Sequence, residues 1–303
     1  MTSDIGAVVV TYNRLDKLKK ALASYSAQEL LPKYLVVVNN ASTDETGVFL
    51  EAWQKQPEGF QKIVITSEEN LGGSGGFYLG QKKALDLDAD WVMLADDDAY
   101  PEPDYLIGMQ NYIDTHDKEK ISVVCGKVME KGSPVNVHRA YLKSKWDRNF
   151  QAFIPLEYYE KEFFEPDFVS YVGIVINKSK LLSAGLVNKD FFIWYDDTEH
   201  SYRLSQQGKL ICLPSYIMLH DVAEDNLTFS WKYYYGFRNN VVFFKKHFSF
   251  QYPFVIIKFL LKTLLCPLHG RSFSEVRLRF AAVKDGIQGN LGKHKLYKPG
   301  WKP

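Results

Sequence analysis

The sequence predicts an α/β protein with a mostly parallel, doubly wound sheet, followed by a helical C-terminal region. Over the first hundred residues, short apolar runs rich in β-branched side chains alternate with segments of helical spacing. Polar or glycine-rich turns follow these runs, and beyond residue 228 the pattern is helical. We therefore expect a catalytic-type α/β domain over residues 1–225 and a helical region over residues 226–303.

The predicted elements of the first hundred residues alternate in order. Buried strands are expected at residues 5–11, 34–39, 62–66 and 90–95. The helices between them are expected at residues 14–27, 42–56 and 75–88. Ser42 or Thr43 would cap the second of these helices, whose inner face would carry Val48, Phe49 and Trp53.

The following residues are less regular. A helix over 103–115 and a strand over 121–129 precede an insertion of loops and short strands at 130–168. The later strands are expected at residues 169–176, 209–213 and 216–220. The later helices are expected at residues 178–184 and 196–207, each with a glycine just past its end.

Composition excludes several classes of protein. Of the 303 residues, 46% are hydrophobic and 24% are charged, which excludes disorder as the main state. Three cysteines at no motif spacing exclude a disulfide scaffold and a cysteine zinc site, and they fit a reducing compartment. Because Asp4 precedes only a short apolar run, we expect no secretory signal and a cytoplasmic location.

The net charge of +1 conceals a strong asymmetry. Residues 226–303 contain 14 basic and 2 acidic side chains, a local charge of +12. The remaining residues contain 23 basic and 34 acidic side chains, a charge of −11. An acidic body with a basic extension indicates two different tasks, although a solvated basic face would give the same count.

Asp96, Asp97 and Asp98 directly follow a predicted buried strand. Three adjacent carboxylates repel one another unless a cation neutralises them, and Mg²⁺ and Mn²⁺ prefer oxygen ligands. Open α/β sheets bind ligands at the carboxyl ends of their strands. This position favours a divalent metal site over a solvated acidic turn.

A glycine-rich segment from Asn70 to Gly76 follows the third predicted strand. Glycines let a backbone approach a ligand closely and expose N–H donors. The segment lacks the Gly-Lys-Ser/Thr of a Walker loop, and a dinucleotide fingerprint would follow the first strand instead. Taken alone, the segment fits a plain turn as well as a ligand loop.

Acidic and aromatic residues meet where a late helix is predicted to begin. Acidic residues at this point often serve only as caps or dipole partners. Trp194 and Tyr195 beside Asp196 and Asp197 would also form a sugar platform with a general base. His220 ends a late strand, and a lone histidine is more often structural.

Five motifs stand in a fixed order along residues 4–222: VTYNR from Val10, NASTD from Asn40, NLGG from Asn70, the acidic triplet, and FFIWYDDTEHSYRL from Phe191. Together they resemble the inverting, metal-dependent family-two glycosyltransferases of the GT-A fold. The resemblance implies a GT-A nucleotide-diphospho-sugar transferase fold with a mostly parallel central sheet, here carrying a C-terminal helical extension.

The resemblance also implies a role for individual residues. Asp96 and Asp98 would bind Mn²⁺ or Mg²⁺ with His220 as a third ligand, Asp97 would lie near the ribose or the donor sugar, and Asp197 would deprotonate the acceptor hydroxyl. The other residues expected to bind the nucleotide or donor are Thr11, Asn13, Arg14, Asp44, Asn70, Gly72 and Gly73. Those expected to bind the acceptor are Trp194, Tyr195, Asp196 and Glu199.

Within the family, the motifs are most similar to those of bacterial galactofuranosyltransferases and nearby rhamnosyltransferases. Their pattern usually has Trp next to the acidic pair, whereas Tyr195 intervenes here. The resemblance favours UDP-galactofuranose as donor and a polyprenyl-linked or cell-surface glycan as acceptor, with dTDP-rhamnose as the alternative donor. More distant alternatives are a sugar-phosphate nucleotidyltransferase and a non-catalytic glycan-binding protein.

The C-terminal region mixes basic and apolar residues. Residues 253–266 are apolar except for Lys258 and Lys262, which lie about one helical turn apart and make the uninterrupted run too short to cross a membrane. This pattern predicts a basic amphipathic helix on an anionic bilayer, at the inner face of the cell membrane. Packing on the catalytic domain or within a homo-oligomer is the alternative, and no nucleic-acid partner is expected because the acidic body would repel a polyanion.

Overall fold

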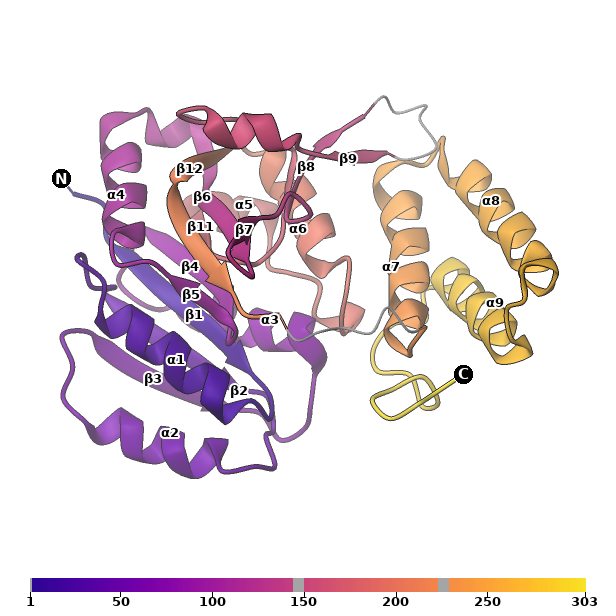
Figure 1. The fold of residues 1–303 in the computed structure, drawn as a ribbon, viewed down its shortest axis with the longest axis horizontal. Coiled ribbons are helices and arrows are strands. Elements are labelled where there is room, and N and C mark those ends of the chain that lie inside the picture. The colour runs from indigo at the N-terminus through magenta and orange to yellow at the C-terminus, as the bar shows by residue number, and fades with distance from the viewer. Residues whose placement is uncertain (1, 144–149, 223–228) are drawn as a thin grey trace.

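The computed structural model describes residues 2–143, 150–222 and 229–303. Among them, nine strands form a central sheet in the order β3-β2-β1-β4-β11-β6-β12-β5, with β7 paired to β6 (Figure 1). Three more strands form a small sheet in the order β10-β8-β9. The expected α/β architecture with C-terminal helices is confirmed.

The strands of the central sheet are β1 (Ile5–Thr11), β2 (Tyr34–Asn39), β3 (Gln61–Thr66), β4 (Trp91–Asp96), β5 (Ala99–Pro101), β6 (Ile121–Glu130), β7 (Ser133–Pro134), β11 (Ile174–Asn177) and β12 (Lys209–His220). The small sheet contains β8 (Arg139–Leu142), β9 (Gln151–Phe153) and β10 (Phe168–Val169). The α-helices are α1 (Leu15–Ser26), α2 (Thr46–Lys55), α3 (Gly72–Leu85), α4 (Tyr105–Thr115), α5 (Lys178–Ala184), α6 (Asp196–Ser205), α7 (Lys232–His247), α8 (Tyr252–Leu265) and α9 (Phe273–Gln288). Short 3-10 turns are η1 (Lys118–Lys120), η2 (Leu156–Glu160), η3 (Lys189–Phe191) and η4 (Pro267–His269).

The first four strands run parallel. β1 lies between β2 and β4, and β2 pairs in parallel with β3. β11 is antiparallel to both of its neighbours, β4 and β6, so β6 again points the same way as β4. The carboxyl ends of β1, β2 and β4 therefore meet at one edge of the sheet, where an open α/β sheet binds its ligand.

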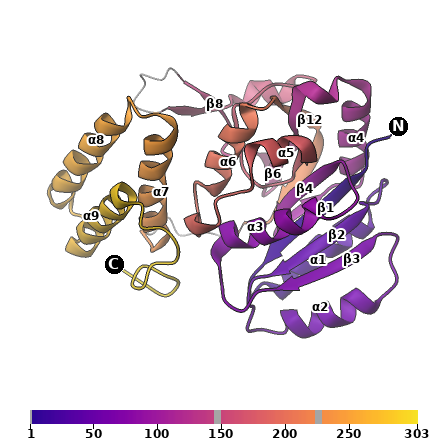
Figure 2. The same cartoon turned by 180° about the vertical axis from the view of Figure 1, so that it is seen from behind.

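Alternate residues of β1 face two different helical layers. Ile5, Ala7 and Val9 pack in a core with side chains of α1, α2 and α4 (Figure 1). Val8 and Val10 pack in a second core with side chains of α3, α5 and α6 (Figure 2). Burial on both faces explains why β1 reads as a continuous apolar run rather than an alternating one.

The glycine-rich segment belongs to a helix rather than to the turn that the sequence predicted, because α3 begins at Gly72. Its glycines let α3 pack closely on β1. A Cβ atom at Gly76 would lie 2.5 Å from Val10 Cγ1, and one at Gly80 would lie 2.2 Å from Val8 Cγ1. Only glycine permits this separation between helix and sheet.

Helix α2 differs from its prediction. It begins at Thr46 and is not capped by Ser42 or Thr43, because these two residues instead form hydrogen bonds with Asn13 in the turn after β1. Trp53 is buried as predicted, but Val48 is 75% exposed. The prediction that Val48 lies on the inner face is wrong, because only the side of α2 that carries Leu50 and Trp53 packs against the core.

Two predicted strand boundaries are also wrong. The strand expected over 169–176 is split into β10 and β11, because Gly173 between them takes a positive φ of 74°. The two strands expected after residue 208 form a single strand, β12, whose register with β6 shifts between Leu213 and Ile217. Strand β12 therefore stays paired with β6 on both sides of this shift, where the sequence suggested a break between two strands.

Helices α7, α8 and α9 form a group to one side of the sheet (Figures 1 and 2). Helix α7 nevertheless packs into the rest of the molecule: Phe243, Phe244 and Phe248 share a core with Ala140 and Phe168 of the small sheet. The expected division between residues 225 and 226 lies outside the described residues.

Candidate active site

A cleft of about 750 Å³ opens at the carboxyl ends of the parallel strands. Its lining comes from turns after β1, β2 and β4, from the first turn of α3, from the segment before α6, and from the end of β12. The predicted site residues that line it are Thr11, Arg14, Asn70, Gly72, Gly73, Asp96, Asp98, Trp194, Asp196, Asp197 and His220. Residues from five separate motifs thus meet in one cavity.

Three predicted nucleotide- or donor-binding residues lie outside this lining: Asn13, Asp44 and Asp97. The Asn13 side chain accepts a hydrogen bond from the Thr43 backbone N–H at 2.7 Å and so joins the turns after β1 and β2. The exposed Asp44 accepts a hydrogen bond from the Thr46 N–H at 3.0 Å, where α2 begins. In this structure Asn13 and Asp44 shape the rim rather than the cleft itself.

The acidic triplet lies at the end of β4, next to the basic side chain of Arg14. Asp97 is fully buried, outside the cleft lining, and accepts a hydrogen bond from the Thr11 hydroxyl at 2.7 Å. The Arg14 guanidinium lies 2.5 Å from Asp98 Oδ2 and 3.3 Å from Asp97 Oδ1, and Lys17 lies 3.6 Å from Asp98. The basic side chains near the triplet thus form ion pairs with Asp97 and Asp98.

Asp96 carries the least compensated carboxylate of the three. Burial and the neighbouring charges of Asp98 and Asp97 raise the pKa of Asp96 to about 7. Burial also raises the pKa of Asp98, but the nearby His220 imidazole and the Arg14 charge outweigh that effect and bring it below the usual range. Among the residues that the structure describes, none forms a hydrogen bond or ion pair with the Asp96 side chain. A cation bound here would relieve this charge.

His220 links the triplet to two residues that sequence reasoning missed. Its Nε2 lies 3.6 Å from Asp98 Oδ1, and its Nδ1 lies 2.8 Å from Glu130 Oε1. The same Glu130 oxygen lies 2.9 Å from His138 Nε2, and His138 Nδ1 lies 2.8 Å from the Ser170 hydroxyl. The carboxylate fixes one nitrogen of His220 and leaves the other facing Asp98, as in carboxylate–histidine–metal arrangements.

Two sets of side chains offer metal ligands at or beside the cleft, and among the described residues only the second has all its ligand atoms close together. Asp96, Asp98 and His220 offer two carboxylates and one imidazole at the cleft, a donor set that suits Mn²⁺ or Mg²⁺. Glu130, His138 and His220 also form a cluster whose ligand atoms all lie within 4.8 Å of one another. Burial lowers the pKa of His138 to about 4, despite its hydrogen bond to Glu130, so this imidazole is neutral at pH 7.

The segment before α6 has an unusual backbone. Phe192, Trp194 and Tyr195 have φ angles of 68°, 63° and 67°, a region that L-residues rarely adopt. Such conformations cost about 1–3 kcal/mol each and persist only where surrounding contacts impose them. The conformation brings Trp194, 39% exposed, and Asp197 to the cleft.

Helix α7 supplies the contacts that hold this segment. The Asn239 side-chain amide lies 2.9 Å from Phe191 O, 3.1 Å from Ile193 O and 2.8 Å from Trp194 O. The neighbouring Arg238 donates to Phe191 O at 2.9 Å and to Asn239 Oδ1 at 2.9 Å. Both polar side chains are buried, so the hydrogen bonds are fully desolvated.

The Trp194 ring also rests on α7. A Cβ atom at Gly236 would lie 2.9 Å from Trp194 Cε3, and the Tyr233 ring meets Trp194 edge-on at 5.3 Å between centroids. Tyr195 turns away from the cleft into the core of α7, where its hydroxyl accepts a hydrogen bond from Asn240. Of the two adjacent aromatics, Trp194 is therefore the one available to a ligand.

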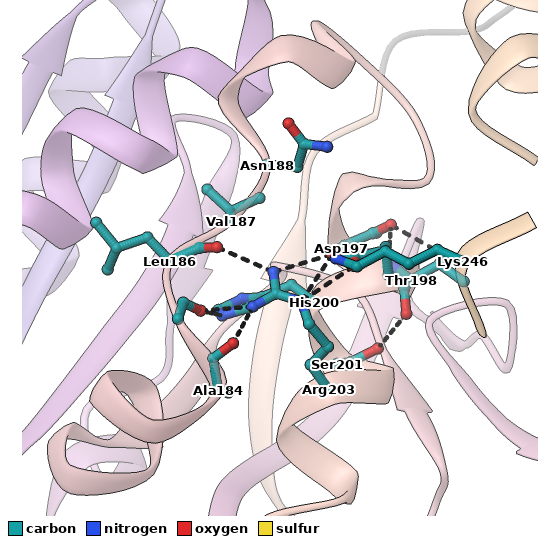
Figure 3. A network of polar contacts seen from close by, with 12 residues as sticks. Ala184, Leu186, Val187, Asn188, Asp197, Thr198, His200, Ser201, Arg203 and Lys246 are labelled. Carbon is teal, nitrogen blue, oxygen red and sulfur yellow. Dashed lines mark hydrogen bonds and ion pairs between the residues drawn. The ribbon is translucent and has the colours of Figure 1, made fainter. Parts of the chain in front are cut away.

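Glu199 lies in a buried ion network instead of the cleft. Its carboxylate contacts Arg203 at 2.9 Å, Lys246 at 2.8 Å and His247 at 2.9 Å, and these partners hold its pKa well below the usual range despite burial. Arg203 also donates to the carbonyl groups of Ala184, Gly185 and Leu186 (Figure 3). The network ties α5, α6 and α7 together.

The two aspartates at the start of α6 differ in access. Asp196 is buried, whereas Asp197 is half-buried and accepts hydrogen bonds from the Thr198 N–H at 2.6 Å and hydroxyl at 3.3 Å. Burial raises the pKa of both carboxyls, and the charge of Asp197 raises that of Asp196 further. Asp197 is the more accessible base.

The sequence held signals for some of the missed residues. Glu130 ends a predicted strand region, as Asp96 does, and the same rule about strand ends would have selected it. Asn239 and Asn240 form a polar pair within an aromatic helix, a pattern that indicates buried hydrogen bonding. His138 lies in a loop with no local signal.

A family model described as "Glycosyl transferase family 2" matches residues 7–173, more than half of the chain. The chain belongs to glycosyl transferase family 2. The match begins within β1, includes the acidic triplet and ends at residue 173, before the Trp194–Glu199 segment and His220, so it does not assign roles to those residues.

Relatives of this glycosyltransferase agree with the family. Galactofuranosyltransferase GlfT1 of Mycobacterium tuberculosis (strain ATCC 25618 / H37Rv) is 44% identical over 102 residues, 34% of this chain. The aligned region spans only 33% of that relative's length.

Two solved structures share the fold. Staphylococcus aureus TarS 1-349 in complex with UDP-GlcNAc superposes with a TM-score of 0.59 at 17% identity, covering 94% of this chain and 81% of that one. GalNAc-T7 with UDP, GalNAc and Mn²⁺ gives a TM-score of 0.60 at 14% identity, covering 80% and 48%. The GT-A fold expected from the sequence is confirmed.

We expect Asn239→Ala to lower the turnover of this glycosyltransferase on the order of 10²-fold, the scale of a misplaced reacting group. The substitution removes the Asn239 donor from the carbonyl groups of Ile193 and Trp194, at about 1–3 kcal/mol each, and leaves Phe191 O with Arg238 as its donor. Nucleotide affinity should change little, because the nucleotide side of the cleft lies on β1 and α3. Steady-state kinetics and a calorimetric nucleotide titration measure the two effects.

Asn290→Ala is the matched control, because this exposed asparagine bonds only with Asp285 and Gln288 among the described residues. It should preserve both turnover and nucleotide affinity. If Asn239→Ala weakened nucleotide binding as much as turnover, α7 would support the whole cleft and not the 191–194 segment specifically.

Proposed function

We propose that the protein is an inverting, metal-dependent glycosyltransferase that moves galactofuranose from UDP-galactofuranose to a polyprenyl-linked or cell-surface glycan. One observation carries the proposal: Asp96, Asp98 and His220 line the same cleft as Trp194 and Asp197. The cation-binding side chains suit a diphosphate leaving group, and the aromatic side chain and the accessible carboxylate beside them suit a sugar acceptor.

The residues present fit a divalent cation. Asp96 faces the cleft with a pKa raised to about 7 by burial and by adjacent carboxylates, which is the electrostatic state that a cation stabilises. Asp96, Asp98 and His220 would hold the ion, with Glu130 orienting His220 from behind. When bound, the metal neutralises the charge that develops on the leaving diphosphate.

The reaction follows from the placement of the side chains. Asp197 accepts the proton of the acceptor hydroxyl as its oxygen attacks the anomeric carbon, and the bond between that carbon and the diphosphate oxygen breaks. The electron pair leaves with the nucleoside diphosphate. A single displacement inverts the anomeric centre and needs no covalent enzyme intermediate.

The placement of the binding residues refines their proposed roles. Thr11, Arg14, Asn70, Gly72 and Gly73 lie at the cleft and would contact the nucleotide or donor. Asp97 would support Thr11 and Arg14 from below, in place of direct contact with the sugar.

On the acceptor side, Trp194 and Asp196 line the cleft, whereas Glu199 would act by fixing α6. The lining residues Trp231, Lys232 and Pro299 are additional candidates for acceptor contact, supplied by the C-terminal region.

The proposed donor rests on the relatives. The GlfT1 relative is a galactofuranosyltransferase by name, and 34% of this chain aligns with it at 44% identity. A thymidine diphosphate rhamnose donor is the second candidate, favoured by the similarity of the sequence motifs to rhamnosyltransferases.

The decisive experiment is a screen of sugar nucleotides, read by released nucleoside diphosphate, with and without EDTA. We expect release from UDP-galactofuranose, its loss in EDTA, and its recovery with Mn²⁺ or Mg²⁺. Asp98→Asn should abolish release because it removes a ligand charge, while the thermal melt stays near that of the parent. Full turnover in EDTA would disprove the metal assignment, and turnover with dTDP-rhamnose alone would replace the donor.

We expect Asp197→Asn to reduce turnover by at least about 10²-fold, the scale of losing a general base, with donor affinity preserved. Since burial raises the pKa of Asp197, the parent's turnover should rise with pH as this base loses its proton. The rising limb of the pH–rate profile should lie above the pH range in which an aspartate ordinarily ionises. A pH–rate profile measures this limb. An active Asp197→Asn beside an inactive Asp196→Asn would reverse the assignment within the pair.

Glu130→Gln should weaken Mn²⁺ binding by about 10–100-fold, the usual effect of removing a carboxylate that orients a ligating histidine. Electron paramagnetic resonance titration of Mn²⁺ without substrate reads the affinity directly. Glu119→Gln is the control, because this carboxylate is 84% exposed and pairs only with Lys180 across 3.6 Å among the described residues. Equal Mn²⁺ affinity in both variants would show that Glu130 does not position His220.

A further inference from the structure

The outer side of α8 is apolar and open to solvent. Of its fourteen residues only Thr263 is buried. The exposed large apolar side chains are Phe254 (63%), Ile257 (54%), Leu261 (56%), Leu264 (63%) and Leu265 (47%). Their spacing of three and four residues places them on one stripe of the helix.

The opposite side of α8 packs against the other helices of the group. Phe259 meets Phe237 of α7 at 5.5 Å between ring centroids, and Val255 joins the core that contains Phe243. The exposed stripe is therefore a second apolar surface that no described part of the chain covers. The flanking turns extend it with Phe250, 58% exposed, and Leu268, 80% exposed.

Helix α9 presents a similar outer face. Phe273 is 80% exposed, and Phe280 and Ile287 are each 39% exposed. They are seven residues apart, so they lie on one side of the helix, and the exposed Arg277 and Lys284 lie on that same side between them. Apolar and basic side chains thus alternate along α9.

The charge of this surface has one sign. Lys258 and Lys262 lie on α8 beside the apolar stripe. The two acidic residues between 226 and 303 lie on other sides of α9: Glu275 is buried against Arg279 at 2.9 Å, and Asp285 accepts from the Tyr234 hydroxyl at 2.6 Å. The exposed faces of α8 and α9 therefore combine apolar side chains with basic ones, among them the exposed Lys262, Arg277 and Lys284.

We propose that the outer faces of α8 and α9 bind the surface of an anionic lipid bilayer, with the apolar stripe inserted among the headgroups and the lysines and arginine at lipid phosphates. Amphipathic helices with apolar stripes flanked by basic residues bind in this way. No helix among the described residues is long and apolar enough to span a membrane, which leaves binding in the plane of the surface.

The same surface suits other occupants less well. A two-fold contact between copies would bring each basic face against an identical one, so positive charges would oppose each other. A nucleic acid would pair with the basic residues, but it would leave the Phe and Leu stripe without an apolar partner. An anionic bilayer satisfies both parts of the surface at once.

Vesicle flotation of the full chain tests the proposal without any turnover. With vesicles of phosphatidylcholine containing 30% phosphatidylglycerol, we expect binding that weakens at high salt, since screening reduces the lysine and arginine contacts. Lys262→Glu with Lys284→Glu should weaken binding by at least about 10-fold. Leu261→Gln with Leu264→Gln should do the same through the exposed stripe, and it should leave the thermal melt unchanged.

Lys55→Glu with Lys82→Glu is the matched control, with the same charge change on exposed positions of α2 and α3. It should bind vesicles as the parent does. Absence of binding by the parent at low salt would overturn the proposal, as would equal binding by all variants. A concentration-dependent dimer of the parent, abolished by Leu261→Gln with Leu264→Gln, would assign the stripe to a second copy instead. Release of nucleoside diphosphate from the donor, measured without vesicles, separates this outcome from failure of the proposed function.

Discussion

The hydrogen bonds from α7 to the 190–195 segment are the constraint on which the cleft depends. Three residues of that segment occupy a backbone region that L-residues avoid, so the segment has no local preference for its own shape. Buried Asn239 and Arg238 impose it by binding carbonyl groups that would otherwise be unsatisfied. The position of Trp194 and of the helix that begins with Asp196 and Asp197 follows from a helix forty residues further along the chain.

The nucleotide side of the cleft holds the same segment from the opposite direction. The Ser74 N–H of α3 donates to Phe192 O at 3.2 Å, and its hydroxyl donates to Asn188 O at 2.5 Å. A Cβ atom at Gly72 would lie 2.0 Å from Phe192 O, so only glycine fits this contact. Because α3 is itself packed on β1 through glycines, the sheet, α3 and the segment before α6 form one continuous packed assembly.

The sequence predicted the features of the fold and site that local residue patterns determine. Buried strands such as 34–39 and the acidic triplet after residue 95 followed from apolar runs and strand ends, and most of the residues that the family resemblance selected line the cleft. What it missed depends on distant partners. Glu199 carries the charge of a ligand-binding residue, but Lys246 and His247 from α7 enclose it, and no short-range pattern reveals that pairing. Ser42 is a residue type typical of helix caps, yet its hydroxyl instead accepts a hydrogen bond from the Asn13 N–H in the turn after β1.

The C-terminal helices cannot be regarded as an appended anchor alone. Trp231 and Lys232, where α7 begins, line the cleft, and the same helix carries Asn239. Helix α8 packs on α7 and α9 and faces outward from them (Figures 1 and 2). A surface bound through α8 and α9 would thus be connected to the cleft by a single packed helix, α7. The acidic body, repelled by an anionic bilayer, would be held away from it while the basic helices are drawn to it, so the opposite charges of the two regions orient the molecule as well as attach it. For an acceptor fixed in the membrane by its lipid, that orientation sets how far from the bilayer its sugar must extend to reach Asp197.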